Sequence, residues 1–99
     1  SFVTEYPEHQ YTSNARYWLA SAQLSQGKLQ LASSNLHHVV DDINSQERAP
    51  AALALLAKVY QQQQLYNEAD EILEQLRIHY PDSSEAQQIM QNAEPQQPL

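Results

Sequence analysis

Apolar residues recur along this chain at steps of three and four positions, the spacing that places side chains on one face of an α-helix. The pattern predicts five helices, over residues 13–26, 28–43, 50–62, 65–80 and 83–93. The residues expected on the apolar faces are Ala15, Trp18, Leu19 and Ala22 in the first helix, Leu29, Ala32, Leu36, Val39, Val40 and Ile43 in the second, Ala69, Ile72, Leu73, Leu76 and Tyr80 in the fourth, and Ala86, Ile89, Met90 and Ala93 in the fifth.

The residues between these segments are those that end or begin helices. Gly27 suits a helix C-terminus, Pro50 is tolerated in a first helical turn, and Pro81 ends the helix before it. The run Asp82-Ser83-Ser84-Glu85 has the form of a capping box, with an acceptor at the cap and Glu three positions later. Residues 94–99 carry two prolines and no apolar period, so we expect a disordered tail there.

The chain also repeats itself every 37 positions. A period of tens of residues is typical of stacked supersecondary units, because one unit cannot bury its apolar face alone. We therefore predict an all-α stack of helical hairpins, an α-α superhelix of about five helices, with unit one at about 12–43, unit two at about 49–80 and a capping helix at about 83–93. The residues that coincide after the shift are Tyr6 with Ile43 and Tyr80, Ala15 with Ala52 and Ile89, Leu19-Ala20 with Leu56-Ala57, Gly27 with Gln64, Ala32 with Ala69, Leu36 with Leu73, and Val39 with Leu76.

The composition excludes several classes of function. The 99 residues suffice for one domain, and a net charge of −7 with only five scattered bases argues against a nucleic-acid partner, because phosphate neutralisation needs a basic stripe. No apolar run is long enough to span a bilayer, so we expect no membrane insertion. The absence of Cys removes disulfide and thiol chemistry. A protein or peptide partner fits these features.

Small residues at the helix crossings complete a family pattern. The large-small, small and large positions read Leu19-Ala20, Ala32 and Leu36 in unit one, and Leu56-Ala57, Ala69 and Leu73 in unit two. The pattern resembles the tetratricopeptide repeat, in which two antiparallel helices form each unit. The resemblance implies a non-catalytic protein-binding module with a concave groove lined by the first helix of each unit.

A narrower resemblance rests on the links between helices. The runs 2–7, 15–20, 26–28 and 79–83 resemble the C-terminal repeat domain of Tol-Pal-associated periplasmic proteins that coordinate cell division. That resemblance implies a bacterial envelope protein that binds a partner during division. Outer-membrane assembly lipoproteins carry similar Tyr-Pro-x-Ser links, and a regulatory or recruiting tail of a larger enzyme is a third alternative. The run 43–50 departs from the division family, which usually places a second Pro-x-Ser link there.

Alignment to the repeat nominates a polar groove for the partner. The candidate residues are Asn14, Tyr17, Ser21, Ser25, Lys58, Gln61, Gln62, Gln88 and Gln91. Amide and hydroxyl groups of this kind suit an extended peptide or a partner helix. We expect Trp18 to pack in the core, while Tyr17 can lie either in the groove or in the core.

The remaining chemistry-bearing residues predict no site. His37-His38 and Asp41-Asp42 stand four positions apart, which offers two ligands from one helix turn, too few for a metal site, and they are interpreted as a solvated face. The chain has no nucleophile motif, so we predict no catalysis, no cofactor and no metal. Exposed repeat ends at Phe2, Val3, Ile89 and Met90 could stack on a neighbouring copy, which leaves a homo-oligomer as a further possibility.

Overall fold

The computed structural model describes residues 9–93, and every regular element in that range is helical. The predicted all-α stack of hairpins is therefore confirmed. The predicted tail 94–99 and the segment 2–7 lie outside the described residues. The elements are α2 (His9–Ser25), α3 (Leu29–Asp41), η1 (Ile43–Arg48), α4 (Ala49–Gln62), α5 (Tyr66–His79) and α6 (Ser84–Ala93).

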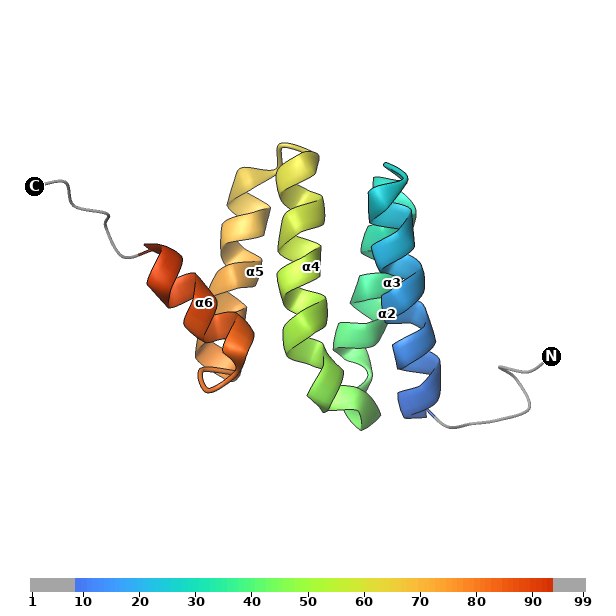
Figure 1. Cartoon of the computed structure of the whole chain (residues 1–99), viewed down its shortest axis with the longest axis horizontal. Coiled ribbons are helices and arrows are strands. Elements are labelled where there is room, and N and C mark those ends of the chain that lie inside the picture. Colours follow the sequence, from blue (N-terminus) through green and yellow to red (C-terminus); the bar gives the residue numbers. More distant parts are fainter. Residues whose placement is uncertain (1–8, 94–99) are drawn as a thin grey trace, which may run out of the picture.

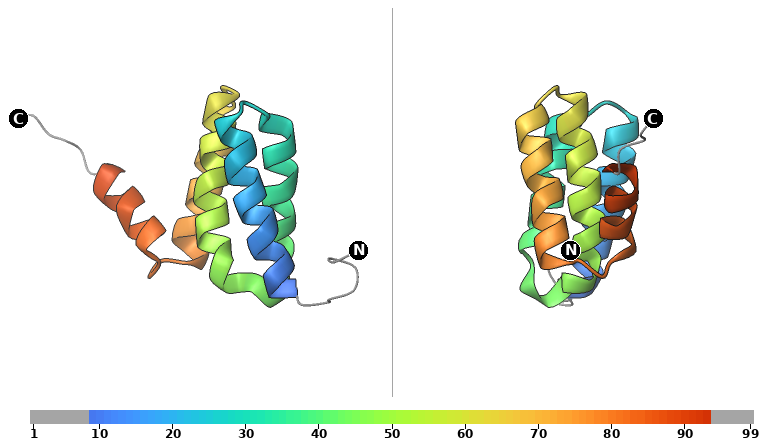
Figure 2. Two further views of the ribbon diagram at one scale, coloured as in Figure 1. Left: turned by 45° about the vertical axis from the view of Figure 1, so that its right-hand side comes forward. Right: turned by 90° about the vertical axis from the view of Figure 1, so that its left-hand side faces the viewer.

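Two antiparallel hairpins, α2–α3 and α4–α5, stand side by side, and α6 follows at one end of the row (Figure 1). Seen along the row, α2, α4 and α6 form one layer and α3 and α5 form the other (Figure 2). The 3-10 helix η1 connects the hairpins and contacts α2, α3 and α4. Its presence corrects the sequence interpretation, which extended the second helix to residue 43 and treated residues 44–48 as an irregular link.

The turns within the two hairpins are the same structure. Gly27 and Gln64 both adopt a positive φ, of 78° and 64°. In each turn the amide of the next residue donates a hydrogen bond to the carbonyl five residues earlier. Lys28 N donates to the Gln23 carbonyl and Leu65 N to the Tyr60 carbonyl, each at 2.8 Å. This is a left-handed helix C-terminus of the Schellman type. The 37-residue period thus extends to individual backbone hydrogen bonds.

Alanines make the close approach within each hairpin possible. Ala20, Ala32 and Ala69 are fully buried and Ala57 is nearly so, in positions related by the repeat. Because helices pack at a separation set by the side chains at their contact, small residues here let the facing helices come close. The large core side chains around them are Leu36, Leu56, Leu76, Val39 and Val59.

The predicted apolar face of the first helix is wrong. The outer stripe of α2, which we define as Ala15, Trp18, Leu19 and Ala22, is exposed to solvent. The core side of α2 is the opposite one, formed by Ser13, Tyr17, Ala20 and Leu24. In α4 the residues 37 positions after the outer stripe are buried or half-buried, because the first hairpin packs against that helix. Arg48 of η1 reaches the edge of this stripe, with its guanidinium carbon 5.9 Å from the centre of the Trp18 ring, but all four side chains of the stripe remain exposed.

Two smaller expectations are also corrected. Ile43 was placed on the apolar stripe of the second helix, but α3 ends at Asp41 and the Ile43 side chain is 81% exposed in η1. The capping residue of α6 is Ser83 rather than Asp82: the Ser83 hydroxyl accepts from the Ala86 amide at 3.0 Å and donates to the Tyr80 carbonyl at 2.8 Å. With Ser83 as the N-cap, the third residue of the helix is Ala86. A capping box needs Glu or Gln at that position to bond back to the cap, so α6 does not have one.

The shared turn geometry predicts that Gln64→Gly stabilises the protein. A residue with a Cβ pays about 1 kcal/mol or more for the left-handed conformation, and glycine recovers most of this despite its greater freedom in the unfolded chain. We expect the free energy of unfolding to rise by about 0.5 to 1 kcal/mol in urea titrations followed by circular dichroism.

Gly27→Gln is the matched control and is expected to lose a comparable amount. A Cβ at position 27 meets no atom within 4 Å, so only the backbone conformation is tested there. An unchanged or lower stability of Gln64→Gly would contradict the assigned turn.

Candidate functional site

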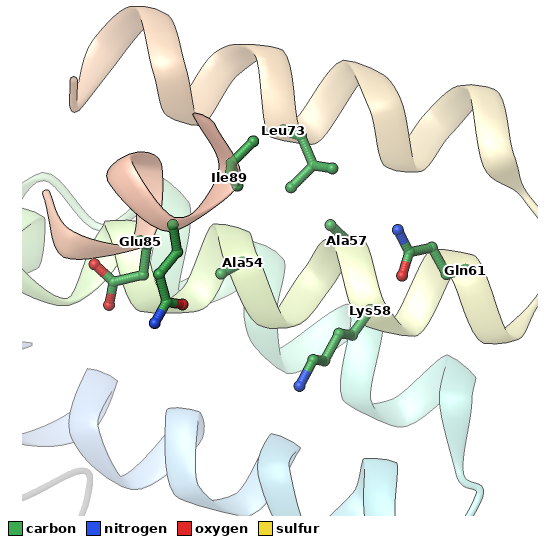
Figure 3. Close-up of a pocket in the computed structure, with 8 residues that line it drawn as sticks. Ala54, Ala57, Lys58, Gln61, Leu73, Glu85 and Ile89 are labelled. Atoms are coloured by element: carbon green, nitrogen blue, oxygen red, sulfur yellow. The ribbon is translucent and has the colours of Figure 1, made fainter. Parts of the chain in front are cut away.

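The structure brings three of the nine candidate groove residues into one pocket. Lys58 and Gln61 from α4 and Gln88 from α6 line a pocket of about 220 Å³ where α4, α5 and α6 meet (Figure 3). The other residues that line it, which the groove prediction did not include, are Ala54, Ala57, Leu73, Glu85 and Ile89.

The pocket has an apolar interior and a polar edge. Ala54 and Ala57 come from α4, Leu73 from α5 and Ile89 from α6, and each is buried or half-buried. Figure 3 shows Leu73 and Ile89 close together on one side of α4, with Glu85 toward one end of the pocket. A concave apolar surface with a few polar groups at its edge is the usual composition of a binding site.

Charged groups of both signs stand at the edge. The Lys58 side chain is exposed and extends from α4 on the side toward α2, while Gln61 stands at the end of the pocket away from Glu85 (Figure 3). Glu85 is half-buried and accepts a 3.3 Å hydrogen bond from the Ser84 hydroxyl. Within residues 9–93 the ion pair found is Arg77 with Glu74 on α5, so neither Lys58 nor Glu85 is neutralised by a described partner.

Asn14 and Tyr17 do not reach this pocket but hold the junction of the two hairpins. Arg48, the residue before α4, donates from Nε to Asn14 Oδ1 at 2.9 Å. The Arg48 guanidinium carbon also lies 4.9 Å from the centre of the Tyr17 ring, a cation–π contact. The Tyr17 ring packs against the core. Both residues therefore contact Arg48 at the junction of the two hairpins, and the half-buried Tyr17 ring packs against the core, while a groove role for it stays a prediction.

The other candidates stand apart from the pocket. Ser21 and Ser25 lie near the end of α2, where the Ser25 hydroxyl donates to the Ser21 carbonyl at 3.3 Å. Gln62 is exposed at the end of α4. Gln91 belongs to α6, but its side chain lies outside the described part of the structure. A binding role for any of the nine residues stays a prediction.

Trp18 is not a core residue. Its side chain is 61% exposed and meets the Tyr17 ring edge-on, with ring centres 5.1 Å apart. Leu19 beside it is 49% exposed. Sequence reasoning missed this because a helical period shows which residues share a face, but not whether anything covers that face. The repeat carried a usable signal, since a shift of 37 places these residues on the side of α4 that meets the preceding hairpin.

Two polar side chains of the predicted solvated face, His37 and Asp42, are engaged in structural contacts outside the pocket. His37 Nε2 lies 2.9 Å from the Tyr60 hydroxyl, and the buried Ser13 hydroxyl donates to Asp42 at 2.6 Å. Within the described residues no group of three or more His, Cys, Asp or Glu is placed to hold a metal ion. No helix in that range has the length and apolar character needed to cross a bilayer.

Comparisons with known proteins agree with this architecture. The family profile of the tetratricopeptide repeat-like domain matches residues 1–89, which is most of the chain. Neither the search of curated proteins nor that of solved structures returned a match.

The exposure of Trp18 predicts an optical signature, because it is the sole tryptophan of the chain. We expect the dilute, monomeric protein to emit near the wavelength of free tryptophan, and acrylamide to quench this emission almost as well as in the urea-unfolded protein. An exposed indole is solvated by water in both states. A blue-shifted emission that is protected from acrylamide would show that Trp18 is covered.

Proposed function

Because this chain belongs to the tetratricopeptide repeat-like domain family, we propose that it binds a segment of a partner protein on the layer formed by α2, α4 and α6. Domains of this kind generally mediate protein–protein interaction and are typically non-catalytic. An extended peptide or a single helix is the occupant that suits a narrow surface with amide and charged groups at its edge.

The observation that carries this proposal is the pocket between α4, α5 and α6. It is the place where three helices from two successive units converge, and its apolar interior is open to the solvent. Lys58, Gln61 and Gln88 present donors and acceptors around it, and all three side chains are exposed. Exposed polar groups around an apolar depression provide orientation, while the depression provides affinity.

For the biological setting we propose the bacterial envelope, with a role in Tol-Pal-linked cell division. The support is the sequence resemblance in the links, including Tyr80-Pro81-Asp82-Ser83, where Ser83 caps α6. An outer-membrane assembly lipoprotein and the recruiting tail of an enzyme are the alternatives. The complete reading frame of the gene separates them: a signal peptide with a coiled coil supports the first, a lipobox cysteine the second, and a catalytic domain the third.

The groove is tested with peptides selected from a random displayed library on the purified protein. We expect the triple variant Lys58→Ala, Gln61→Ala, Gln88→Ala to weaken the selected peptides by about tenfold or more, because hydrogen bonds of about 0.5 to 1.5 kcal/mol each are lost. Fluorescence polarisation with labelled peptide measures the change.

The matched control removes the same residue types elsewhere. Lys28, Gln30 and Gln75 are all exposed and none lines the pocket, so their joint change to Ala is expected to leave affinity within about twofold. Equal losses of peptide affinity in the two triple variants would show that the peptides do not bind at Lys58, Gln61 and Gln88. Unchanged affinity of the variant at these three residues would show the same.

A second candidate function is self-association through the outer stripe of α2. The repeat ends expected to stack are Phe2, Val3, Ile89 and Met90, but Phe2, Val3 and the Met90 side chain lie outside the described part of the structure, and Ile89 lines the pocket. The outer stripe replaces them as the exposed apolar surface. In α4 the equivalent residues are covered by helices of the first hairpin. We therefore expect a helix of a second copy to pack on the outer stripe of α2 in the same manner.

Sedimentation equilibrium over a range of concentrations tests this association. We expect the mean mass of the protein to rise with concentration, and Trp18→Glu with Leu19→Glu to remain monomeric, because charges cannot be buried in an apolar contact without a partner. Leu31→Glu with Ile78→Glu, two exposed apolar residues of α3 and α5, is the control that should still associate. A strict monomer at every concentration excludes the second copy.

A further inference from the structure

The pocket has a counterpart in unit one that is filled. Subtracting 37 from each residue number identifies the counterpart positions of the pocket. The corresponding pairs are Ala54 with Tyr17, Ala57 with Ala20, Lys58 with Ser21, Gln61 with Leu24, Leu73 with Leu36, Glu85 with Arg48, Gln88 with Ala51 and Ile89 with Ala52.

Two of these eight pairs are identical, and among the other six the largest loss of side-chain volume in unit two is from Tyr17 to Ala54. In unit one, the Tyr17 ring packs against the core between α2 and the start of α4. Leu36 and Ala52, the counterparts of Leu73 and Ile89, are completely buried. In unit two, Ala54 stands where the ring would be, and the counterparts Leu73 and Ile89 are only half-buried. The pocket is thus the space that a tyrosine side chain occupies in the preceding unit.

The size of the pocket agrees with this origin. A cavity of about 150 Å³ lined by apolar side chains is large enough to bind benzene. The pocket here has about 220 Å³ and is open on one side, so it admits an aromatic ring whose remaining atoms lead out to solvent. Ala54, Ala57, Leu73 and Ile89 provide the apolar surface that such a ring needs.

The charge beside the ring is reversed between the units. In unit one the Arg48 guanidinium lies over the Tyr17 ring, whereas its counterpart in unit two is the carboxylate of Glu85. A ring that enters the second site therefore meets the Glu85 carboxylate at the position where unit one has the Arg48 guanidinium, while the Lys58 ammonium stands elsewhere on the edge. The net charge of the chain, −7, also favours approach of a basic segment.

We propose that the pocket of α4, α5 and α6 receives an aromatic side chain of a partner peptide that has Lys or Arg directly beside it. The partner's ring takes the place that Tyr17 has in unit one, and its cation pairs with Glu85. This inference rests on the proposed peptide-binding function and names the chemistry of the bound segment.

Three capped dipeptides serve as probes: N-acetyl-Tyr-Arg-amide, N-acetyl-Tyr-Glu-amide and N-acetyl-Ala-Arg-amide. Titrations are followed by the amide shifts of the labelled protein in two-dimensional NMR. We expect Tyr-Arg to shift amides of residues 54–61, Leu73 and Ile89. Ala-Arg should bind about tenfold or more weakly because the buried ring is lost. Tyr-Glu should bind about threefold more weakly, since the pair with Glu85 is partly exposed.

Variants of the chain make the assignment specific. Ala54→Tyr restores the side chain of unit one and is expected to abolish the shifts caused by Tyr-Arg, whereas Ala22→Tyr, on the exposed side of α2, should leave them unchanged. Glu85→Arg leaves the pocket open and is expected to reverse the order of Tyr-Arg and Tyr-Glu. This second variant keeps the test decisive if Ala54→Tyr is poorly folded.

The outcomes also separate this inference from the function on which it rests. If Tyr-Arg and Ala-Arg bind alike, or if Glu85→Arg leaves the order of the probes unchanged, the aromatic site is excluded. Library peptides that still depend on Lys58, Gln61 and Gln88 would then leave groove binding intact. If the library peptides bind the triple variant as tightly as the unchanged protein, while Tyr-Arg behaves as expected, the proposed groove function is wrong. The pocket would then be a site for small aromatic groups only.

Discussion

The close packing of two helices at alanine residues is the constraint on which the rest of this structure depends. Ala20 and Ala32 in the first hairpin, and Ala57 and Ala69 in the second, are buried where the facing helices meet. The short distance between helices that they permit makes each hairpin thin enough for the next one to pack against its side. The row of hairpins, and the layer of α2, α4 and α6 along it, follow from that packing.

Within this regular framework, the positions where the two units differ are the ones that can give unit two a binding site that unit one lacks. Identical turns at Gly27 and Gln64 show how closely the backbones correspond. Against that background, the pocket is lined by Ala54 and Glu85 at the positions where unit one has Tyr17 and Arg48. A repeat protein can gain a binding site in this way by losing one side chain, at no cost to the backbone that surrounds it.

The candidate site was only partly predictable from the sequence. Lys58, Gln61 and Gln88 were nominated by repeat alignment and do lie around one pocket. Asn14 and Tyr17 were nominated by the same rule but are occupied with Arg48 at the junction of the units. Alignment finds the side of a helix that faces the groove, yet it does not show whether a neighbouring side chain already fills the space. A pocket forms where neighbouring side chains leave space unfilled, and the amino-acid sequence does not show where this happens.

By itself, the sequence determined the helices, the turns and the 37-residue period, because each depends on residues close together in the chain: apolar spacing, Gly27, Pro50 and Pro81. Only the tertiary structure decided which face of α2 is buried. Ala15, Trp18, Leu19 and Ala22 have the spacing of an apolar stripe, but burial requires a neighbour, and the neighbour of α2 packs on its other side. A local pattern specifies the shape of a helix, whereas the free energy of burial belongs to the contact between helices.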